Sequence, residues 1–293
     1  MDMSVFEVKA YAKINLYLEV LERLPNGYHT IDSVMQTVSL CDVVRVVVNK
    51  SECTTIRIGC NNKDVPCDSG NTAYKAAELF LEHVGESAEV EIYIDKVIPM
   101  CAGLGGGSTD AAAVLRALNK AYGEKLTVEE LCAIGVRVGA DVPFCVKGGA
   151  TVCTGIGEIF APCPELSEEY GILIAIGKQG SPTPEAYKKI DNIKNRSIRS
   201  SSEAMVEALS GADIKRICKE LYNAFEKVVL PSNEECSKIR RLMSVCGAQG
   251  VLMSGSGASV FGIFTDMNKM EYAKKEIEKI TGSVYTAHCV KGL

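Results

Sequence analysis

Length, composition and charge already exclude several classes of protein. The chain has 293 residues, of which 47% are hydrophobic and 24% charged. These values are typical of one large or two ordinary globular domains and argue against disorder. Its 37 acidic and 32 basic residues leave a formal net charge of −5, which argues against a generic surface for nucleic acid or anionic membranes and favours a small-molecule partner.

Cysteine spacing and the start of the chain indicate the compartment. Thirteen cysteines are spread singly along the sequence without a C-x-x-C pair, so they signal neither a zinc knuckle nor a redox pair. No apolar run is long enough to span a membrane. Met1 leads almost directly into an apolar alternation that leaves no room for a signal peptide. We therefore expect a soluble cytoplasmic protein with reduced cysteines.

The first segment of the chain reads as a series of strands. Apolar residues recur near period two from Val5 to Val20, which predicts a strand. Lys13 and Asn15 lie within it, and a lysine in an apolar strand is either an edge residue whose amine reaches water or a functional cation. A Pro-Asn-Gly turn that carries Tyr28 and His29 follows and first of all indicates a hairpin. Further strands are predicted over residues 34–40, 43–48 and 54–58.

A helix over residues 71–84 and a strand over residues 90–94 lead into a glycine-rich loop. The loop consists of Pro99, Met100, Cys101, Ala102, Gly103, Leu104, Gly105, Gly106, Gly107, Ser108 and Thr109. An Ala-rich helix follows, with Ser108, Thr109 and Asp110 as its expected caps. A glycine loop that opens a helix directs free N–H groups and the positive end of the helix dipole at one point, which suits a phosphate. The alternative is a turn that merely connects a strand to a helix.

This loop matches neither of two common nucleotide motifs. A Walker loop needs a lysine before its final Ser or Thr, and here Ser108 follows Gly107 directly. The dinucleotide fingerprint needs a third glycine at the position where, counted from Gly103, Ser108 stands. A nucleotide bound here is therefore held by another design.

A carboxylate near the end of the first half is a second candidate. Thr127 to Glu130 forms a capping box that opens a further helix. Asp141 then precedes Pro143, which disfavours helix at Val142. We therefore expect Asp141 on a turning or extended segment that faces the negative end of the preceding helix. Such a carboxylate is either a plain turn residue or is held there by a cation or a function. A strand over residues 150–154 ends this half.

The second half is predicted to mix strands and helices. An apolar strand spans residues 171–177, and Thr183 can cap a short helix that has Pro184 in its first turn and carries Tyr187. The basic stretch 188–199 is a solvated face or mobile loop, with a binding patch as the alternative. Helices are expected over residues 203–209, 213–229, 234–246 and 268–280, with a strand, loop and strand over 251–264 and a last strand over 283–290. This order is that of a split βαβ sandwich, so the fold class is α+β, built from two-layer α/β sandwiches.

Three segments far apart in the sequence together carry a resemblance to a known family. They are Ala-Tyr-Ala-Lys-Ile-Asn-Leu at residues 10–16, the loop and helix start at residues 99–113, and Met-Ser-Gly-Ser-Gly-Ala at residues 253–258. This arrangement resembles the GHMP kinases, named for galactokinase, homoserine kinase, mevalonate kinase and phosphomevalonate kinase, over essentially the whole chain. The resemblance implies an N-terminal ATP-binding domain over residues 1–160, a C-terminal ferredoxin-like domain over residues 161–293, and a substrate site between the two.

The resemblance also implies an activity. Within the family, the sequence around Lys13, Tyr28 and Asp141 is similar to that of the kinases of non-mevalonate isoprenoid synthesis whose acceptor is a methylerythritol linked to cytidine diphosphate. It implies transfer of the γ-phosphoryl group of ATP to the 2-hydroxyl of that acceptor, with Mg²⁺ as the expected partner of ATP. Asp141 and Lys13 would be the catalytic pair, with Asn15 beside them in the same site.

The same resemblance assigns the binding residues. Tyr28 and His29 would stack on the cytosine and hydrogen-bond to it. Tyr187 would cover the other face of the base, with Thr183 in the same substrate pocket. Residues 99–109 would bind the ATP phosphates.

The chain departs from the family pattern at two positions. The loop often continues Ser-Ser-Asn, where this chain has Ser108-Thr109-Asp110, and Asp110 is expected to cap the helix or to help hold a metal. Tyr187 stands where phenylalanine is also seen, and a phenol stacks as well as a phenyl ring. No acidic pair in the sequence identifies the ligands of a metal.

Two other functions stay open at this stage. Another small-molecule kinase of the family, of the homoserine or mevalonate type, would not need aromatic residues around a base. A non-catalytic nucleotide-binding sensor would not need Lys13 and Asp141. In each case the partner is a small molecule rather than nucleic acid or a membrane, and we expect a monomer or weak homodimer.

Overall fold

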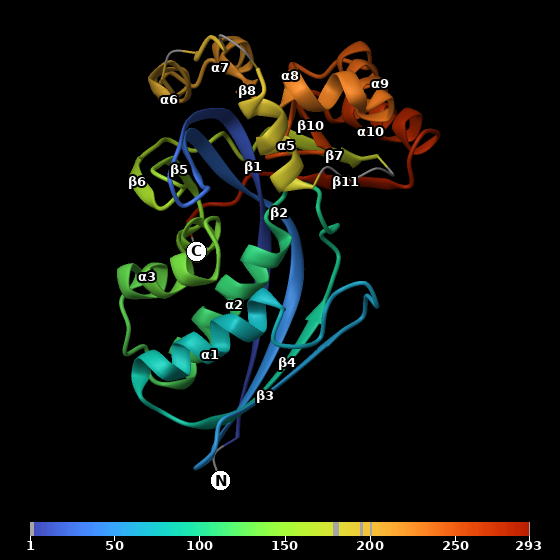
Figure 1. Cartoon of the computed structure of the whole chain (residues 1–293). Helices are drawn as coiled ribbons and strands as arrows, with labels where there is room; N and C mark the ends of the chain where they lie inside the picture. The colour runs from blue at the N-terminus through green and yellow to red at the C-terminus, as the bar shows by residue number, and fades with distance from the viewer. Residues whose placement is uncertain (1–2, 178–181, 194–195, 200, 293) are drawn as a thin grey trace.

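Two long strands form an antiparallel hairpin that runs through the whole first half of the molecule (Figure 1). The computed structural model describes residues 3–177, 182–193, 196–199 and 201–292. Strand β1, Ser4–Arg23, pairs with β2, His29–Lys50. Gly27 turns the chain between them with a φ of 88° and donates its N–H to the Leu24 carbonyl at 3.0 Å, as the Asn-Gly signal predicts. The two strands predicted over residues 34–40 and 43–48 are one strand, because no turn residue interrupts them.

The first sheet has seven strands in the described part of the chain. Their order is β3-β4-β2-β1-β8, with β5 paired to β2 and β6 to β5. The added strands are β3 Thr55–Cys60, β4 Ala88–Asp95, β5 Ala150–Thr154, β6 Ile159–Pro162 and β8 Tyr222–Asn223. Helices α1 Thr72–Val84, α2 Gly106–Ala121, α3 Val128–Val138 and α4 Val142–Lys147 lie on one side of it (Figure 1). Strand β4 therefore alternates buried and exposed residues along its whole length.

Local signals set the ends of α1 and α3. Asn71 accepts the N–H of Ala73 and so caps α1, while Gly85 ends that helix in the left-handed conformation. Thr127 and Glu130 form the predicted capping box of α3. Both helices begin and end within a residue or two of the predicted positions.

The start of α2 differs from the prediction. Its N-cap is Gly105, and no side chain makes a capping hydrogen bond there. The expectation that Ser108, Thr109 or Asp110 caps this helix is wrong, because the helix already begins at Gly106. Its first N–H groups therefore have no side-chain cap to satisfy them, which leaves them available to an anion.

Among the residues that the structure describes, the second sheet has four antiparallel strands in the order β11-β7-β10-β9. They are β7 Gly171–Ile176, β9 Gly250–Met253, β10 Ser259–Phe264 and β11 Ser283–Ala287. Helices α9, Glu234–Val245, and α10, Met267–Glu278, pack on one face through buried residues such as Ile239 and Ile277. The order β7-α9-β9-β10-α10-β11 is that of a split βαβ sandwich, so the predicted ferredoxin-like second half is confirmed.

Both faces of β7 are covered, and every one of its residues is buried. Leu173 and Ala175 belong to the hydrophobic cluster under α9 and α10. Ile172 and Ile174 belong to a second cluster that also contains Ile14 of β1. This second cluster joins the two sheets to each other.

Short elements connect β7 to β9. They are α5 Thr183–Asp191, α6 Glu203–Ser210, α7 Ile214–Glu220, α8 Glu226–Val229 and a 3₁₀ turn at Leu230–Ser232. The single helix predicted over residues 213–229 is wrong. The chain leaves the helix at Leu221, and Tyr222 and Asn223 pair in parallel with Tyr17 and Leu18 of β1. A tertiary contact with the edge of the first sheet thus overrides the helical pattern.

The basic stretch 188–199 is not simply a solvated loop. Glu19 of β1 is fully buried, and Arg196 Nη1 lies 2.8 Å from its Oε1. The backbone N–H of Arg199 donates to Oε2 of Glu19 at 2.9 Å, and the Tyr222 hydroxyl donates to the same oxygen at 3.0 Å. The expectation is therefore wrong for Arg196 and Arg199, while positions 194 and 195 of this stretch lie outside the described residues.

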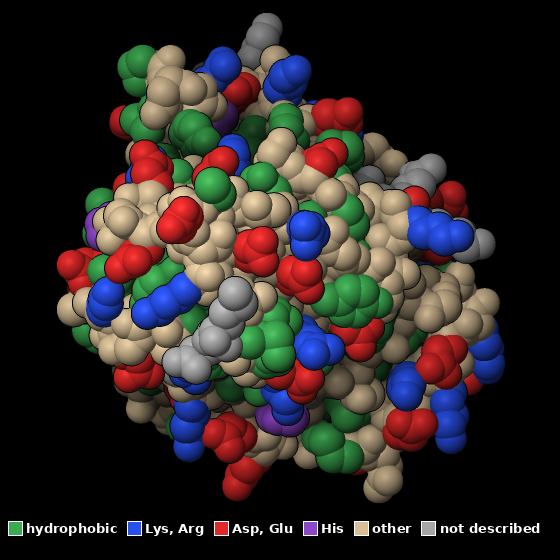
Figure 2. Space-filling model, turned by 90° about the horizontal axis from the view of Figure 1, so that it is seen from below, with side chains coloured by type: hydrophobic (Ala, Val, Ile, Leu, Met, Phe, Trp, Pro, Cys, Tyr) green, Lys and Arg blue, Asp and Glu red, His purple; other side chains and the backbone are tan. Residues whose placement is uncertain are grey.

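The surface carries charges of both signs. Figure 2 shows the molecule from below, and on this face the acidic and basic side chains of the described residues are interspersed. None of the helices in the described ranges has the length and hydropathy needed to cross a bilayer. All thirteen cysteines are free thiols.

Candidate active site

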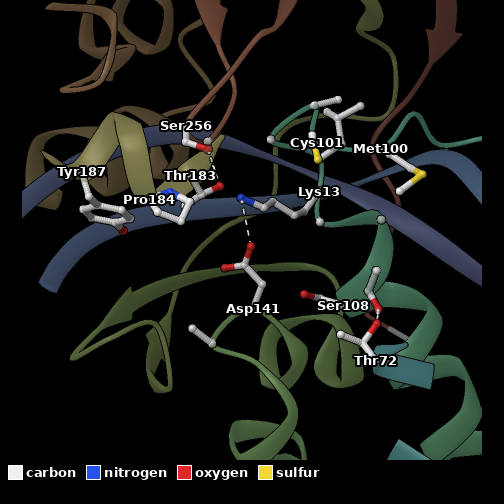
Figure 3. A pocket seen from close by; sticks show the side chains of 18 of the residues that line it. Lys13, Thr72, Met100, Cys101, Ser108, Asp141, Thr183, Pro184, Tyr187 and Ser256 are labelled. Atoms are coloured by element: carbon white, nitrogen blue, oxygen red, sulfur yellow. Dashed lines mark hydrogen bonds and ion pairs between the residues drawn. The ribbon is translucent and has the colours of Figure 1, made fainter. Parts of the chain in front are cut away.

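A pocket of about 820 Å³ receives side chains from both halves of the chain. Figure 3 shows Tyr187 at one end, Met100 and Cys101 at the other, and Lys13 and Asp141 facing each other between them. The lining comes from β1, the start of β2, the loop before α2, the turn before α4, helix α5 and the turn between β9 and β10. A ligand with two distant functional parts would fit such a site.

The pocket brings together nearly all of the residues that the sequence indicates. They are Lys13, Asn15, Tyr28, His29, Pro99 to Ser108, Asp141, Thr183 and Tyr187. Thr109 does not line the pocket, because its side chain is buried and its Oγ1 donates to the Tyr11 carbonyl at 2.7 Å. This hydroxyl therefore ties the loop to β1, and a contact of Thr109 with the ATP phosphates stays a prediction.

An irregularity in the β1–β2 ladder positions the glycine loop. The regular register is interrupted between Tyr11 and Lys13, and here the Lys13 N–H donates to the Leu104 carbonyl at 3.0 Å instead of to β2. Bulges of this kind re-aim side chains and are frequent beside functional sites. The loop and the side chain of Lys13 are therefore held in a fixed relation by the backbone.

Two loop positions require glycine. Gly103 has a φ of 76° and Gly105 a φ of 73°, a region that disfavours other residues. A Cβ atom on Gly103 would lie 2.1 Å from the Ser254 carbonyl oxygen, and one on Gly105 would lie 3.1 Å from Cγ of Lys13. The Ser254 hydroxyl also donates to the Gly103 carbonyl at 3.0 Å. The three segments that carry the sequence resemblance thus meet at this point.

Lys13 and Asp141 form an ion pair inside the pocket. Nζ of Lys13 lies 3.5 Å from Oδ2 of Asp141, and the two side chains are 5% and 32% exposed. Nζ also donates to Oδ1 of Asn15 at 2.8 Å. Oδ1 of Asn15 accepts the Gly255 N–H at 3.0 Å as well, while its Nδ2 donates to the Ser33 hydroxyl at 2.9 Å. Asn15 therefore fixes the direction of the ammonium group, which faces a partly exposed carboxylate.

The backbone around Asp141 differs from the prediction. Asp141 is the N-cap of α4, and Val142 and Pro143 are the first helical residues. The expectation that Pro143 keeps Val142 out of a helix is wrong, because proline is well tolerated in a first helical turn. The Asp141 side chain makes no capping hydrogen bond. Its carboxylate is therefore not used to cap α4 and can serve the pocket.

Aromatic rings gather at the opposite end of the pocket from the loop. Tyr28 is 54% exposed. The rings of His29 and Tyr187 stack on each other, with centroids 4.6 Å apart and planes at 18°, and Phe225 meets Tyr187 edge-on at 4.9 Å. No base fits between His29 and Tyr187 in this arrangement. Burial raises the pKa of the Tyr187 phenol, and the charge of Asp141 raises it further, so the phenol stays neutral.

Two contacts in this region were not foreseen from the sequence. Thr183 is the first residue of α5 rather than its cap, which is Pro182, and its Oγ1 lies 2.8 Å from Oγ of Ser256. Asp191, at the end of α5, lies 2.7 Å from the His29 ring. The sequence carries no signal for this pair, because the two residues are far apart in the chain and Asp191 lies in an ordinary polar helix.

A buried charge cluster at the base of the loop was also missed. Nζ of Lys96 lies 2.7 Å from Oδ2 of Asp42 and 2.5 Å from Oδ2 of Asp110. Oδ1 of Asp42 accepts the N–H groups of Val97 and Ile98 at 2.6 and 2.7 Å. Asp110 is therefore used in an ion pair rather than as a cap. A charged residue at the end of an apolar strand is a weak signal, and pairing Asp42 with Lys96 needs the β2–β4 register.

Comparison with known proteins identifies the family. The sequence models of the GHMP kinases N terminal domain and of the GHMP kinases C terminal domain match residues 71–149 and 205–281. The 4-diphosphocytidyl-2-C-methyl-D-erythritol kinase of Clostridium beijerinckii is 37% identical over 284 residues, which cover 97% of this chain and 100% of that protein. The chain belongs to this family of GHMP kinases. The kinase of the same name from Exiguobacterium sibiricum is 40% identical over 95% of this chain and 96% of its own.

Solved structures confirm the fold of this GHMP kinase. The crystal structure of a 4-(cytidine 5'-diphospho)-2C-methyl-D-erythritol kinase matches with a TM-score of 0.79 at 30% identity, over 98% of this chain and 100% of that one. A homoserine kinase from Cytophaga hutchinsonii matches with a TM-score of 0.72 at 19% identity, over 96% and 95%. A mevalonate kinase of L. major matches with 0.75 at 17%, over 99% and 97%. The last two share the fold alone.

Proposed function

We propose that this GHMP kinase transfers the γ-phosphoryl group of ATP to the 2-hydroxyl of 4-diphosphocytidyl-2-C-methyl-D-erythritol. The observation that carries the proposal is the position of the Lys13–Asp141 ion pair, between the glycine loop and the aromatic end of one pocket. A triphosphate suits the first end and a base the second. Relatives of that name that match nearly the whole chain support it.

Asp141 is the proposed proton acceptor for the reacting hydroxyl. An alcohol is a weak nucleophile, so the transfer needs its proton accepted and its oxygen held in line with the phosphoryl group. Lys13, 3.5 Å away, stabilises the negative charge of Asp141 and holds the carboxylate towards the acceptor. Asn15 contributes by fixing the position of the Lys13 ammonium group. In this proposal, orienting the acceptor hydroxyl is as important as removing its proton.

The loop is the proposed site of the ATP phosphates. The left-handed glycines expose backbone N–H groups beside the uncapped start of α2. Such N–H groups bind phosphate oxygens and stabilise the charge of the transferring group. Pro99 to Ser108 line the pocket at this end, which supports the assignment.

The aromatic end is the proposed cytosine site. Tyr28 is exposed enough to stack on one face of a base, and His29 is the proposed hydrogen-bond partner. Tyr187, which also lines the pocket, is proposed to cover the other face of the base. Thr183, bonded to Ser256, borders the same site.

Mg²⁺ is the proposed partner of ATP. In the described part of the chain, no group of three or more acidic, histidine or cysteine side chains is placed to hold a metal. The Ser108 hydroxyl and the Asp141 carboxylate line the pocket and are the oxygen donors that would face it. When bound, the ion would offset phosphate charge.

Three further properties are proposed: the domain boundary, the compartment and the oligomeric state. The chain divides at residues 160 and 161 into an ATP-binding part and a second part, which places the boundary within β6. Thirteen free thiols fit a reducing cytoplasm. The enzyme acts as a monomer or weak homodimer.

A coupled assay of ADP release tests the proposed activity. The protein is mixed with ATP and, in separate reactions, with 4-diphosphocytidyl-2-C-methyl-D-erythritol, mevalonate, phosphomevalonate and homoserine. We expect ADP release with the first acceptor alone. Turnover of any other acceptor, or of none, would overturn the proposal, and the second result would indicate a nucleotide-binding sensor.

A further inference from the structure

Helix α5 contacts the His29 ring in two different ways. Its Tyr187 stacks on a face of the imidazole with planes at 18°. Its Asp191, four residues later, places Oδ1 2.7 Å from Nε2 at the edge of the same ring. Residues four apart in a helix lie on one side of it. One helical turn therefore fixes both the plane of the imidazole and its rotation within that plane.

The contact with Asp191 decides which ring nitrogen carries a proton. An ionised carboxylate only accepts hydrogen bonds, so a bond at this distance requires N–H at Nε2 of His29. Arg23 Nε lies 3.8 Å from Oδ2 of Asp191 and already supplies this carboxylate with a positive charge. In the imidazole that carries its single proton at Nε2, Nδ1 is an acceptor.

The other ring nitrogen belongs to a side chain that is 5% exposed and that lines the pocket. Within the described part of the chain, no hydrogen bond reaches Nδ1 of His29, although His29 lines the pocket beside Tyr28. Cytosine presents an amino donor at its position 4, where uracil presents a carbonyl acceptor. An acceptor held at a fixed place therefore favours cytosine and disfavours uracil, because two acceptors that face each other leave both without a partner.

We propose that Asp191 is a positioning residue that makes the pocket selective for cytosine over uracil, by holding His29 as the Nε2–H tautomer with Nδ1 as an acceptor for the 4-amino group. This inference rests on the proposed function, in which His29 contacts the base. Asp191 does not touch the substrate and acts through His29 alone. Tyr187 keeps the ring from swinging away when the base binds.

Calorimetry with CDP and UDP tests the selectivity. The wild-type chain should bind CDP more tightly than UDP, and Asp191→Ala should lower that preference by roughly five- to tenfold, the worth of one hydrogen bond. The matched control is Glu185→Ala, which removes an exposed carboxylate from the same helix and should leave the preference unchanged. An equal loss of affinity for both nucleotides in Asp191→Ala would show that Asp191 only docks α5, and would overturn the inference.

Nitrogen NMR reports the tautomer itself. The chain has three histidines, so ¹⁵N-labelled histidine gives three ring systems, and a His29→Asn variant identifies the signals of His29. We expect a protonated Nε2 and a bare Nδ1 in the wild type, and a mixture of tautomers in Asp191→Ala but not in Glu185→Ala. A ring that already exchanges between tautomers in the wild type would contradict the proposal.

The role of Asp191 and the proposed kinase activity can each be wrong without the other. Turnover of 4-diphosphocytidyl-2-C-methyl-D-erythritol together with a CDP preference that survives Asp191→Ala would overturn the role of Asp191 alone. A CDP preference that depends on Asp191, in a protein that releases no ADP with this acceptor, would overturn the proposed activity alone.

Discussion

Lys96 and Asp110 form a buried ion pair that joins the two ends of the glycine loop. Nζ of Lys96, just before the loop, lies 2.5 Å from Oδ2 of Asp110, just after it. Asp42 shares the same ammonium group at 2.7 Å, and Oδ1 of Asp110 has no hydrogen-bond partner among the described residues. Burial and the charge of Asp42 together raise the pKa of Asp110 to about 7, against the opposing effect of the Lys96 ammonium group.

The first prediction concerns the affinity for ATP. Above pH 7 the cluster carries one excess negative charge beside the proposed phosphate site, and below pH 7 it is neutral. Asp110→Asn removes that charge without changing the shape of the side chain. The ratio of the wild-type KM for ATP to that of the variant should rise about three- to tenfold between pH 6 and pH 8.5, the size expected for one added negative charge near the bound phosphates.

Taking the ratio cancels the titration of ATP itself, which affects both proteins alike. Steady-state assays at fixed Mg²⁺ and ionic strength supply the KM values. A ratio that stays constant over this range would show that Asp110 does not change its charge near pH 7, or that ATP binds elsewhere.

The second prediction is the effect of the same group on stability. A carboxyl whose pKa rises on folding, here from 3.8 to about 7, binds more protons in the folded chain than in the unfolded chain between those values. This group therefore lowers the free energy of unfolding as the pH rises from about 4 to about 7. Urea denaturation should show that Asp110→Asn is more stable relative to the wild type at pH 8 than at pH 5. If Asp110→Asn were instead more stable relative to the wild type at pH 5 than at pH 8, the raised pKa of Asp110 would be contradicted.

The third prediction concerns Asp141. Asp141→Asn keeps the shape of the side chain but cannot accept the proton of the acceptor hydroxyl. Turnover should fall by roughly 10²–10⁴, the usual worth of a general base, while the affinity for CDP stays within a factor of two. Single-turnover ADP release measures the first quantity and calorimetry the second. If the variant retained a third of the parental turnover, Asp141 would have no such role.

The fourth prediction concerns Tyr28. Its ring is 54% exposed, so Tyr28→Ala should leave stability nearly unchanged. Stacking of a base on an aromatic ring is worth about 1–3 kcal/mol, so the Kd for CDP should rise by roughly five- to 100-fold, with the Kd for ATP unaltered. Tyr93→Ala is the matched control, because Tyr93 is 49% exposed and does not line the pocket. Equal CDP affinity in both variants would remove Tyr28 from the base site.

The fifth prediction separates backbone strain from close contact in the glycine loop. Gly103 and Gly123 have φ values of 76° and 78°, so alanine at either position costs about 1–2 kcal/mol through its conformation. A Cβ on Gly123 meets nothing within 4 Å, whereas one on Gly103 meets the Ser254 carbonyl. Gly103→Ala should therefore be clearly less stable than Gly123→Ala in urea and bind ATP more weakly. Similar behaviour of the two variants would show that the loop moves aside freely.

The features that the sequence predicts correctly are set by residues close together in the chain. Gly85, Asn71 and the Thr127 capping box act within one turn of chain, so the ends of α1 and α3 were predictable. Lys13 stood out because a lysine in an apolar strand needs a partner, and its partner is Asp141. Many features of the pocket could therefore be named in advance.

The remaining features depend on contacts between distant segments. Residues 213–229 have a helical pattern, but Tyr222 and Asn223 pair with β1 at the edge of the first sheet. A local pattern carries no information about such a distant pairing. The cluster at Lys96 needs the register between β2 and β4, and the contact of His29 with Asp191 needs the docking of α5. The sequence places Tyr187 on one face of the base, whereas in the structure its ring stacks on His29. This stacking also depends on the docking of α5.

The second half of the chain makes hydrogen bonds with the first sheet, and these affect the cooperativity of folding. The second half of the chain supplies β8 to the first sheet, and the Val290 N–H donates to the Thr37 carbonyl of β2 at 3.0 Å. The Gly255 N–H completes the hydrogen bonds of Asn15, which orients Lys13. Neither half can melt without breaking the hydrogen bonds of the other, so a single calorimetric transition is expected. Lys13, the proposed catalytic lysine, becomes oriented only when both halves have folded.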